Sequence, residues 1–336
     1  MWVCELRDGW SLDKLVLAER PEPEPGAGEA LLRMRAASLN YRDWLLVQGG
    51  YGRAAGSLPL IPVSDGVGEV VAVGPGVTRV APGDRVCPIM FQGWHAGALP
   101  AEAYARVLGG PLDGVMAERM VVPAEDLVVV PDHLSDAEAA CLPCAGLTAW
   151  SAVVAQGGLK PGETVLVLGT GGVALFALQF AKLGGARVIV TSSSDDKLAR
   201  ARTLGADHTI NYRIKPDWGR VARDLAGSGG VDLVIETGGG SLPESLRAVR
   251  PGGRVSLMGV LAGDKLDARL SAIVMRQVRV QGITVGPRAD FEAMVRACAA
   301  HELHPVVDRT FGFDELRPAL EHLASQRHVG KVCPGF

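Results

Sequence analysis

The stretch from Thr164 to Ser194 limits the possible folds of this chain most, because its residue pattern changes from strand to glycine turn, then to helix, and then back to strand. Thr164–Leu168 is a short apolar run typical of a strand buried on both faces, and a glycine turn follows it with no spacer. From Val173 small and apolar residues recur every three or four positions until Gly184-Gly185, which predicts a helix that ends there. Arg187–Thr191 then starts a second strand. This order predicts the opening unit of a doubly wound parallel α/β sheet.

The glycine turn fits the phosphate-binding pattern of dinucleotide folds. Gly169 permits the tight turn, Gly171 lets the backbone approach a pyrophosphate, and Ala174 suits the contact of helix with sheet. N–H groups and the dipole at the start of the helix favour an anion there. A turn chosen for packing alone is the alternative, but the flanking strands and helix favour the cofactor. We predict that a dinucleotide binds Gly169, Thr170, Gly171, Gly172 and Val173.

Length and composition bound the remaining possibilities. The 336 residues are too many for one small core and suit two domains. A net charge of −3, with acids and bases interspersed, gives no basic surface for nucleic acid. No apolar run reaches membrane-spanning length and the N-terminus lacks a signal-peptide pattern, so we expect a cytoplasmic protein with a small-molecule substrate and no membrane partner.

The domain organisation follows from where the pattern changes along the chain. Residues 1–124 predict short strands and frequent turns, with little room for helices. Strands and helices then alternate and predict about six parallel strands, while the tail predicts two amphipathic helices and a final strand, Gly330–Cys333. We expect a Rossmann dinucleotide-binding domain over 125–285, inserted in a β-barrel-like domain formed by 1–124 and 286–336.

Three stretches resemble the medium-chain dehydrogenase/reductase superfamily: Gly66–Gly74, Val80–Val86 and Leu147–Trp150. The resemblance covers nearly the whole chain and implies a GroES-like catalytic domain that holds the inserted Rossmann domain. It also implies an oxidoreductase, commonly a homodimer joined through the edge of the Rossmann sheet. The last predicted strand, Arg279–Val285, has β-branched residues suited to that pairing.

The superfamily divides into zinc alcohol dehydrogenases and zinc-independent reductases, and the ligand positions separate them. At the first two zinc-ligand positions of the zinc branch this chain has Asn40 and Ser64, so Cys144 is the one usual zinc ligand that remains. Catalytic zinc needs about three protein ligands, and we therefore expect no metal. His95 is the one replacement ligand to consider, although a lone histidine in a glycine-rich loop is more often a surface or substrate-loop residue. Cys141 and Cys144 have the spacing of a redox dithiol, but buried packing residues are the better interpretation.

The remaining branch resembles the zinc-independent quinone oxidoreductases and 2-enoyl thioester reductases. Asn40-Tyr41-Arg42-Asp43 is similar to its Asn-x-x-Asp signature, and Gln48–Gly52 is similar to the loop that carries an active-site tyrosine. Reduction of a conjugated C=C bond needs a proton for the resulting enolate, which a phenol can donate. Tyr51 is therefore the candidate acid, with Tyr41 as the second candidate and Asn40 beside it. For Tyr51 the alternative is a turn aromatic that only packs, and for Asp43 it is a bond to local backbone N–H groups.

Cofactor choice is set at the end of the second strand. Ser192 stands where the resembling NAD-dependent zinc enzymes have an aspartate, and Ser192, Ser193 and Ser194 offer hydroxyl donors without charge. The resemblance implies that Lys197 and Tyr212 contact a 2′-phosphate. We predict NADPH, while Asp195-Asp196 leaves NADH open. The resemblance also places the ribose and nicotinamide against Thr148, Thr237, Gly238, Met258, Gly259 and Val260.

The sequence thus predicts an NADPH-dependent reductase of a conjugated carbonyl acceptor, such as a quinone, enone, enal or 2-enoyl thioester, that works without zinc. Two alternatives stay open: a zinc-free or zinc-type alcohol dehydrogenase or carbonyl reductase, and a non-enzymatic NADPH-binding sensor. Residues 91–114 form a longer loop than a core needs, and we expect them to shape the substrate pocket.

Overall fold

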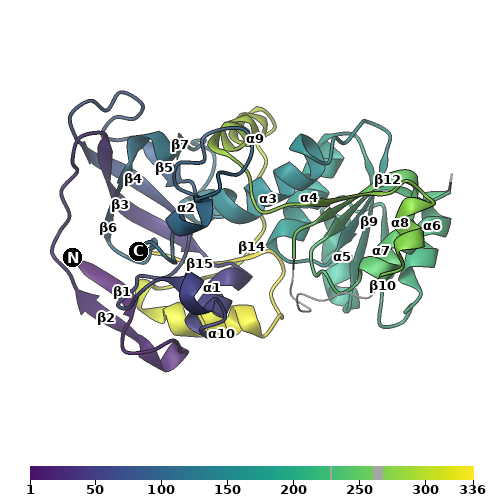
Figure 1. Ribbon diagram of the computed structural model, residues 1–336, viewed down its shortest axis with the longest axis horizontal. Coiled ribbons are helices and arrows are strands. Elements are labelled where there is room, and N and C mark those ends of the chain that lie inside the picture. Colours follow the sequence, from purple (N-terminus) through teal and green to yellow (C-terminus); the bar gives the residue numbers. More distant parts are fainter. Residues whose placement is uncertain (228, 260–267) are drawn as a thin grey trace. The chain divides into compact units, whose positions relative to one another are not determined.

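A computed structural model describes residues 1–227, 229–259 and 268–336 and divides the chain into two compact units (Figure 1). The first unit contains Met1–Ala145 and Pro287–Phe336, and the second contains Gly146–Gly286. We expected the first boundary after residue 124. The segment before Ala145 belongs with the N-terminal strands because its atoms bond to them. Ser38 Oγ donates to Cys141 Sγ (3.5 Å), and the N–H of Cys144 donates to Asp65 (2.9 Å).

The second unit contains the predicted doubly wound sheet, which is confirmed. Its six parallel strands have the order β10-β9-β8-β11-β12-β13. Since β8 lies between β9 and β11, the strand order reverses there, and ligands of such sheets bind at the carboxyl ends of the strands at that point. The bounds are β8 (Thr164–Leu168), β9 (Arg187–Ser192), β10 (His208–Asn211), β11 (Val231–Glu236), β12 (Val249–Leu257) and β13 (Arg279–Gly282).

The helices of this unit begin and end where the sequence indicates. The first, α4 (Gly172–Leu183), packs its small residues Ala174, Ala177 and Ala181 against the core and ends at Gly184. The next, α5 (Asp195–Thr203), is capped by Ser194, whose Oγ accepts the N–H of Lys197 (3.5 Å). The others are α3 (Leu147–Trp150), α6 (Trp218–Ala226), α7 (Leu242–Ala248) and α8 (Leu270–Val274).

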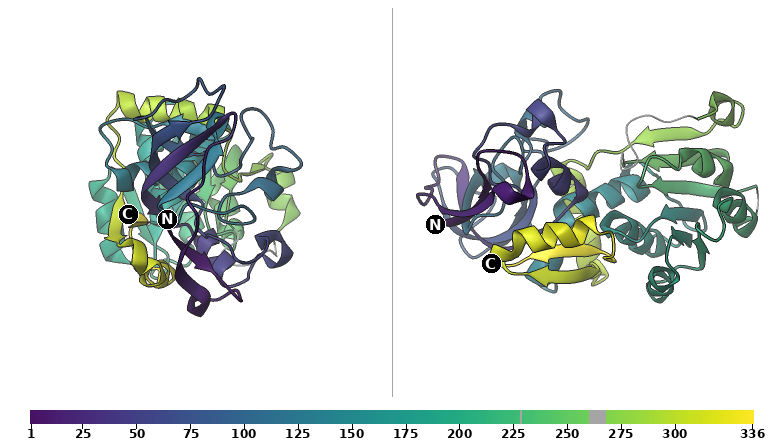
Figure 2. Two further views of the ribbon diagram at one scale, coloured as in Figure 1. Left: turned by 90° about the vertical axis from the view of Figure 1, so that its left-hand side faces the viewer. Right: turned by 90° about the horizontal axis from the view of Figure 1, so that it is seen from below.

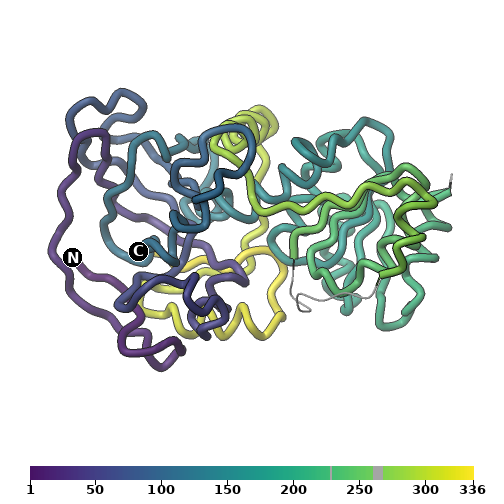
Figure 3. The backbone as a smooth tube through the Cα atoms, in the orientation of Figure 1, coloured from purple at the N-terminus to yellow at the C-terminus, as the bar shows by residue number. Residues whose placement is uncertain are grey.

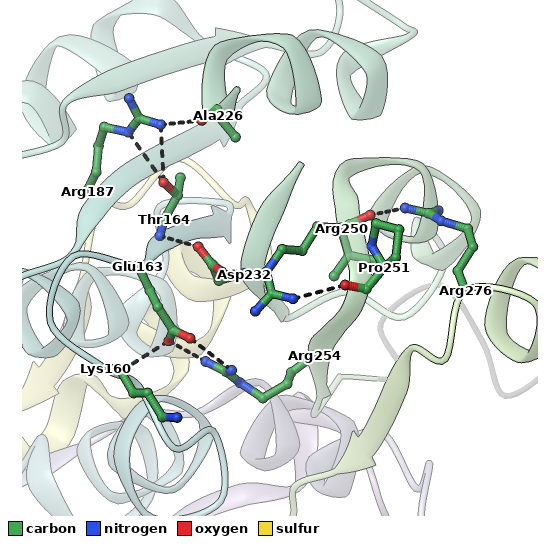
Figure 4. Close-up of polar contacts among 11 residues, drawn as sticks. Lys160, Glu163, Thr164, Arg187, Ala226, Asp232, Arg250, Pro251, Arg254 and Arg276 are labelled. Atoms are coloured by element: carbon green, nitrogen blue, oxygen red, sulfur yellow. Dashed lines mark hydrogen bonds and ion pairs between the residues drawn. The ribbon is translucent and has the colours of Figure 1, made fainter. Parts of the chain in front are cut away.

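Charged side chains tie together the amino ends of the central strands (Figure 4). The Arg254 guanidinium pairs with Glu163, and both side chains are mostly buried. Asp232 accepts the backbone N–H of Thr164 (2.8 Å) and the Nε–H of Arg250 (2.6 Å). The Glu163 and Asp232 carboxylates therefore find their partners within this end of the sheet, whereas the glycine turns lie at the opposite, carboxyl end.

The first unit is built on a five-stranded antiparallel sheet with the order β6-β3-β4-β5-β7. One helix corrects the expectation that this region leaves little room for helices: α1 (Tyr41–Val47) follows β3 directly. The Asp43 carboxylate accepts the backbone N–H of Asn40 (2.7 Å) and so caps the start of α1. The strands are β1 (Trp2–Leu6), β2 (Leu15–Glu19), β3 (Glu29–Ser38), β4 (Asp65–Val73), β5 (Arg85–Pro88), β6 (Arg119–Pro123) and β7 (Leu127–Val129), and α2 (Asp136–Ala139) completes the segment before Ala145.

The C-terminal segment returns to this unit, as the sequence predicted (Figure 3). After α9 (Arg288–Ala300), β14 (Val307–Phe311) pairs in parallel with β15 (Lys331–Pro334). The N–H of Leu39 donates to the carbonyl of Val332 (2.9 Å), so that β15 runs beside the end of β3. Figure 2 shows α10 (Leu316–Ala324) over these strands. The return brings Lys331 next to Asn40. None of the helices in the described ranges is long and apolar enough to cross a bilayer.

Candidate active site

The carboxyl end of the Rossmann sheet carries an open glycine turn. Gly169 has φ +88°, a conformation that side-chain-bearing residues rarely adopt. Gly171 precedes α4, and a Cβ placed on it meets no atom of the described residues within 4 Å. The first turn of α4, with Gly172 and Val173, presents N–H groups that have no acceptor within the helix. This arrangement suits a pyrophosphate.

The ends of three neighbouring strands meet beside this turn. The Thr237 hydroxyl, just after β11, donates to the carbonyl of Leu168 at the end of β8 (2.7 Å). At Gly259, after β12, a Cβ would lie 1.6 Å from the Thr237 carbonyl oxygen, so only glycine fits. The N–H of Met258 donates to the carbonyl of Glu236 (3.1 Å). Thr237, Met258 and Gly259 thus lie at the reversal point of the strand order. Val260 lies outside the described residues.

The side chain of Glu236 has a role that the sequence analysis missed. It is fully buried, and its carboxylate accepts the N–H groups of Gly238 and Gly239 and the hydroxyls of Ser241 and Ser245. The carboxylate therefore shapes the turn after β11 and does not face a ligand. The two serines that follow at helical spacing were the available signal for this local capping.

The predicted ribose residues gather at the end of β9. Ser192 is buried in the strand, and its carbonyl accepts the N–H of Tyr212 (3.1 Å), whose ring is exposed. The Ser194 side chain caps the start of α5, and Ser193, just before it, is half-buried. Asp195 accepts the side-chain amide of Asn211 (2.9 Å), so this carboxylate has a structural partner. Thr148 is buried on α3 of the same unit.

In the first unit, six side chains form a polar cluster: Asn40, Asp43, Ser64, Asp65, Cys144 and Lys331. Asp65 is fully buried and accepts the Ser64 hydroxyl (2.8 Å) and the N–H of Cys144 (2.9 Å). The Lys331 ammonium, only 3% exposed, donates to Asn40 Oδ1 (2.6 Å) and to the carbonyl of Leu39 (2.5 Å). The cluster joins β3, β4, the segment before α3 and β15.

Burial raises the pKa values of the acidic groups in this cluster. It raises the pKa of Asp43 to about 6, and the Arg42 guanidinium opposes that shift. Burial also raises the pKa of Asp65, against the Lys331 ammonium and the Asn40 amide. Burial, together with the Asp65 carboxylate, raises the pKa of Cys144 to about 12.

A zinc ion does not fit these side chains. Asn40 Oδ1 accepts a hydrogen bond from the Lys331 ammonium, and the Ser64 hydroxyl donates to Asp65. A second cation in contact with Lys331 would also be repelled. His95 does not join the cluster, because its Nε2 bonds Asp126 (2.8 Å).

Tyr51 lies in the loop after α1 and is 39% exposed. The Arg42 guanidinium stands 5.8 Å from the centre of its ring and also donates to the carbonyls of Leu108 (3.1 Å) and Gly110 (3.3 Å). Burial raises the pKa of Tyr51 and Arg42 opposes the shift, so the phenol stays protonated near neutral pH. Tyr41 is the first residue of α1 and is half-buried.

The sulfur atom of Cys141 lies next to that of a cysteine other than Cys144. Cys141 Sγ lies 3.5 Å from Cys333 Sγ, and both thiols are buried and free. Burial raises the pKa of Cys141 well above its ordinary value. An inaccessible thiol of this kind packs like a small apolar side chain, in agreement with the packing interpretation.

Comparison with known families gives two matches. The model of the alcohol dehydrogenase GroES-like domain matches residues 26–132, and the zinc-binding dehydrogenase model matches residues 172–300. A zinc-type alcohol dehydrogenase-like protein of Schizosaccharomyces pombe is 43% identical over 312 residues, which cover 91% of this chain and 90% of the relative. Acryloyl-coenzyme A reductase of Metallosphaera sedula is 33% identical over 323 residues, or 94% of each chain.

Solved structures that resemble this chain likewise carry dehydrogenase or reductase names. A crystal structure from Sinorhizobium meliloti 1021 that carries the alcohol dehydrogenase name has a TM-score of 0.94 and 45% identity, over 100% of this chain and 99% of the other. An NAD-dependent alcohol dehydrogenase has a TM-score of 0.88 and 34% identity over 100% of both chains. A 2-octenoyl-CoA carboxylase reductase in complex with NADP and 2-octenoyl-CoA has a TM-score of 0.87 and 25% identity, over 99% and 87%.

Proposed function

The chain belongs to the medium-chain dehydrogenase/reductase superfamily and is an oxidoreductase, and from that premise we propose that it reduces conjugated carbonyl compounds with NADPH and without zinc. The observation that carries the proposal is the polar cluster, in which the Lys331 ammonium bonds the Asn40 side chain, while the Asp65 carboxylate accepts the Ser64 hydroxyl and the backbone N–H of Cys144. A chain without a metal must activate its substrate by hydrogen bonds and proton donation. The similarity to acryloyl-coenzyme A reductase supports a conjugated acceptor.

The residues divide the chemistry between them. When bound, the reduced nicotinamide supplies a hydride to the β-carbon of the conjugated acceptor, and the displaced electron pair moves to the carbonyl oxygen. We propose that the Tyr51 hydroxyl donates its proton to the α-carbon and that water reprotonates the phenolate. The Arg42 guanidinium beside the ring stabilises that phenolate while it exists. Tyr41 is the second candidate for this proton transfer.

The cofactor cradle consists of backbone groups of the glycine turn and hydroxyls at the strand ends. We propose that the pyrophosphate binds at Gly171 and the start of α4, and that the 2′-phosphate binds beside Ser192, Lys197 and Tyr212. Asp195 accepts the side-chain amide of Asn211, which holds this carboxylate in place but leaves its negative charge, so NADH stays the alternative cofactor. Thr148, Thr237, Gly238, Met258 and Gly259 complete the proposed cradle around the ribose and nicotinamide.

The test of the proposed function compares matched substrates. Purified protein is incubated with NADPH and an α,β-unsaturated ketone, aldehyde or thioester, or a quinone, and separately with the saturated analogue of each. We expect NADPH oxidation with the conjugated compounds and a rate at least about tenfold lower with saturated aldehydes or ketones. Oxidation of saturated alcohols, assayed separately with NADP⁺, should be slower by a similar factor. Equal rates with a saturated aldehyde would favour the second candidate, a carbonyl reductase or alcohol dehydrogenase, which the names of several relatives support.

Metal content tests the zinc-free part independently. We expect elemental analysis of active protein to find no stoichiometric zinc, and we expect activity to survive dialysis against a chelator. One zinc per chain, removable with loss of activity, would contradict the proposal.

We further propose a homodimer through the edge of the Rossmann sheet. Strand β13 is exposed and pairs only with β12 in the part of the chain that the structure describes (Figure 2). Nearby, Leu270 is 75% exposed and Met275 is 80% exposed, an apolar surface that an edge-to-edge partner would cover. Light scattering at micromolar concentration should give twice the mass of one chain, and Val280→Pro should reduce it. A monomeric wild type would contradict the dimer.

A further inference from the structure

Lys331 is a buried charge that the proposed chemistry has not yet used. It reaches Asn40 from the opposite end of the chain, and its ammonium is 3% exposed. Burying an ammonium costs several kcal/mol unless other groups compensate for it. The compensation comes from Asp43 and Asp65, two fully buried carboxylates that both feel its charge. A lysine needed only for packing would not require such an arrangement.

The contact between Lys331 and Asn40 fixes the orientation of the Asn40 amide. An ammonium has three donors and no acceptor, so the atom that faces it must be the amide oxygen. The amide NH₂ group therefore points away from Lys331. Its Nδ2 is buried and makes no hydrogen bond of normal geometry with the described residues, although it lies close enough to Asp65 to stabilise that carboxylate. A buried donor without a full acceptor is costly, and a ligand oxygen would satisfy it.

We propose that Lys331 is the positioning residue of the reductase site: its ammonium takes the place of a metal in the polar cluster and holds the Asn40 amide so that its N–H is offered to the substrate's carbonyl oxygen. The inference rests on the proposed function, because the oxygen in question is that of the conjugated acceptor. As negative charge develops on it during hydride transfer, the hydrogen bond from Asn40 strengthens.

The arrangement explains why the three zinc-branch positions form no metal site. Asn40 accepts from Lys331, while Ser64 and the backbone of Cys144 both donate to Asp65. The fixed cation is therefore supplied by the chain itself. Removing it should disturb the amide that depends on it and leave the glycine turn of the other unit intact.

The test is a double-mutant cycle on turnover with a conjugated acceptor. Lys331→Met keeps much of the side-chain length and removes the charge, and we expect kcat to fall roughly 10- to 100-fold, as for other residues that orient a ligand-binding group. NADPH affinity, measured by fluorescence titration, should not change. Because Lys331 acts through Asn40, the double variant Lys331→Met/Asn40→Ala should be no slower than Asn40→Ala alone. Lys331→Arg, which keeps a cation, should recover part of kcat.

Two further variants separate positioning from folding. Lys182→Met, which removes an ammonium from a partly exposed pair with Asp207, is the matched control and should leave kcat unchanged. If Lys331→Met does not fold, Lys331→Met/Asp65→Asn also removes one of the two buried carboxylates that compensate the Lys331 charge, and it should restore folding but not turnover. Additive effects of Lys331→Met and Asn40→Ala, or full activity of Lys331→Met, would overturn the inference alone. A wild type that reduces no conjugated acceptor would overturn the proposed function and this inference with it.

Discussion

The proposed cofactor cradle and the polar cluster are built in opposite ways. The cradle lies at the carboxyl ends of β8, β9, β11 and β12 and consists of turns, each local in sequence, with a free helix N-terminus and small hydroxyls. The polar cluster is made of buried side-chain charges from residues as far apart as Asn40 and Lys331. The cradle offers backbone groups to a ligand, whereas the cluster satisfies its side chains mostly with one another.

This difference predicts where single substitutions act. A backbone cradle tolerates many side-chain changes, provided that the space reserved for the ligand stays open. A buried charge cluster has no such tolerance, because removal of one member leaves its partner unpaired in a low-dielectric interior. We therefore expect larger effects from the first unit than from the second.

The largest expected effect is that of Tyr51→Phe. The change keeps the ring beside Arg42 and removes only the hydroxyl, so kcat with an enone should fall about 10²-fold, the scale of a lost general acid. NADPH affinity should stay the same, because Tyr51 belongs to the other unit. Steady-state kinetics with NADPH titration checks both. A quinone should be less affected than an enone, because its reduced anion is already delocalised.

Tyr41→Phe is the matched variant for Tyr51→Phe, because Tyr41 lies in the same part of the chain and is the second candidate for the proton donor. If Tyr41→Phe is inactive and Tyr51→Phe is fully active, the proton donor is Tyr41. If both variants are active with every acceptor, water protonates the product and no tyrosine is required.

The second prediction concerns the pH dependence of stability that Asp43 creates. Burial raises the pKa of Asp43 to about 6 in the folded state, whereas the unfolded chain releases this proton near pH 4. Between these values the folded state holds more protons, so stability falls as pH rises through the window, by about 3 kcal/mol. Asp43→Asn removes this loss. The Tm of the variant minus that of wild type should therefore increase by several degrees between pH 4.5 and pH 7.5.

Subtracting the wild-type Tm cancels the titration of the other carboxylates, which both proteins share. Asp196→Asn, on the exposed face of α5, is the control for the loss of a carboxylate that is not buried. A Tm difference for Asp43→Asn that decreases toward pH 7.5 would mean that Asp43 is held in its ionised form.

The contrast between the two regions also marks what the sequence could predict. The strands and helices from Thr164 to Glu236 were predicted to within a few residues, because periodicity, caps and glycines are local signals. Helix α1 was missed, since its cap depends on Asp43 bonding the N–H of Asn40 within a segment interpreted as a signature motif. Lys331 could not be connected to Asn40 at all, because only the return of β15 to β3 brings them together.

A third prediction tests whether the cradle reserves space for its ligand. Gly171→Ala adds a methyl group where no described residue lies within 4 Å, so the Tm should not change. The methyl group would enter the proposed pyrophosphate position, and NADPH and NADH affinity should both fall by about tenfold. Fluorescence titration measures the affinity and thermal unfolding the stability.

Two other glycines serve as controls for Gly171→Ala. Gly282 also has no neighbour within 4 Å in the described structure, and Gly282→Ala should affect neither stability nor cofactor affinity. At Gly259 a Cβ would lie 1.6 Å from the Thr237 carbonyl oxygen, so Gly259→Ala should lower the Tm as well as the affinity. An unchanged cofactor affinity in Gly171→Ala would place the pyrophosphate elsewhere.

The smallest expected effect, and the one that decides cofactor choice, is that of Lys197→Ala. A half-exposed ammonium beside a phosphate contributes about 1 kcal/mol, so NADPH affinity should fall about fivefold, and more at low ionic strength. NADH lacks the 2′-phosphate and should bind as before. Lys160→Ala removes an ammonium at the amino end of the same sheet and is the control that should affect neither cofactor. Equal losses for NADPH and NADH in Lys197→Ala would show that this lysine supports the shape of α5 and does not recognise the phosphate.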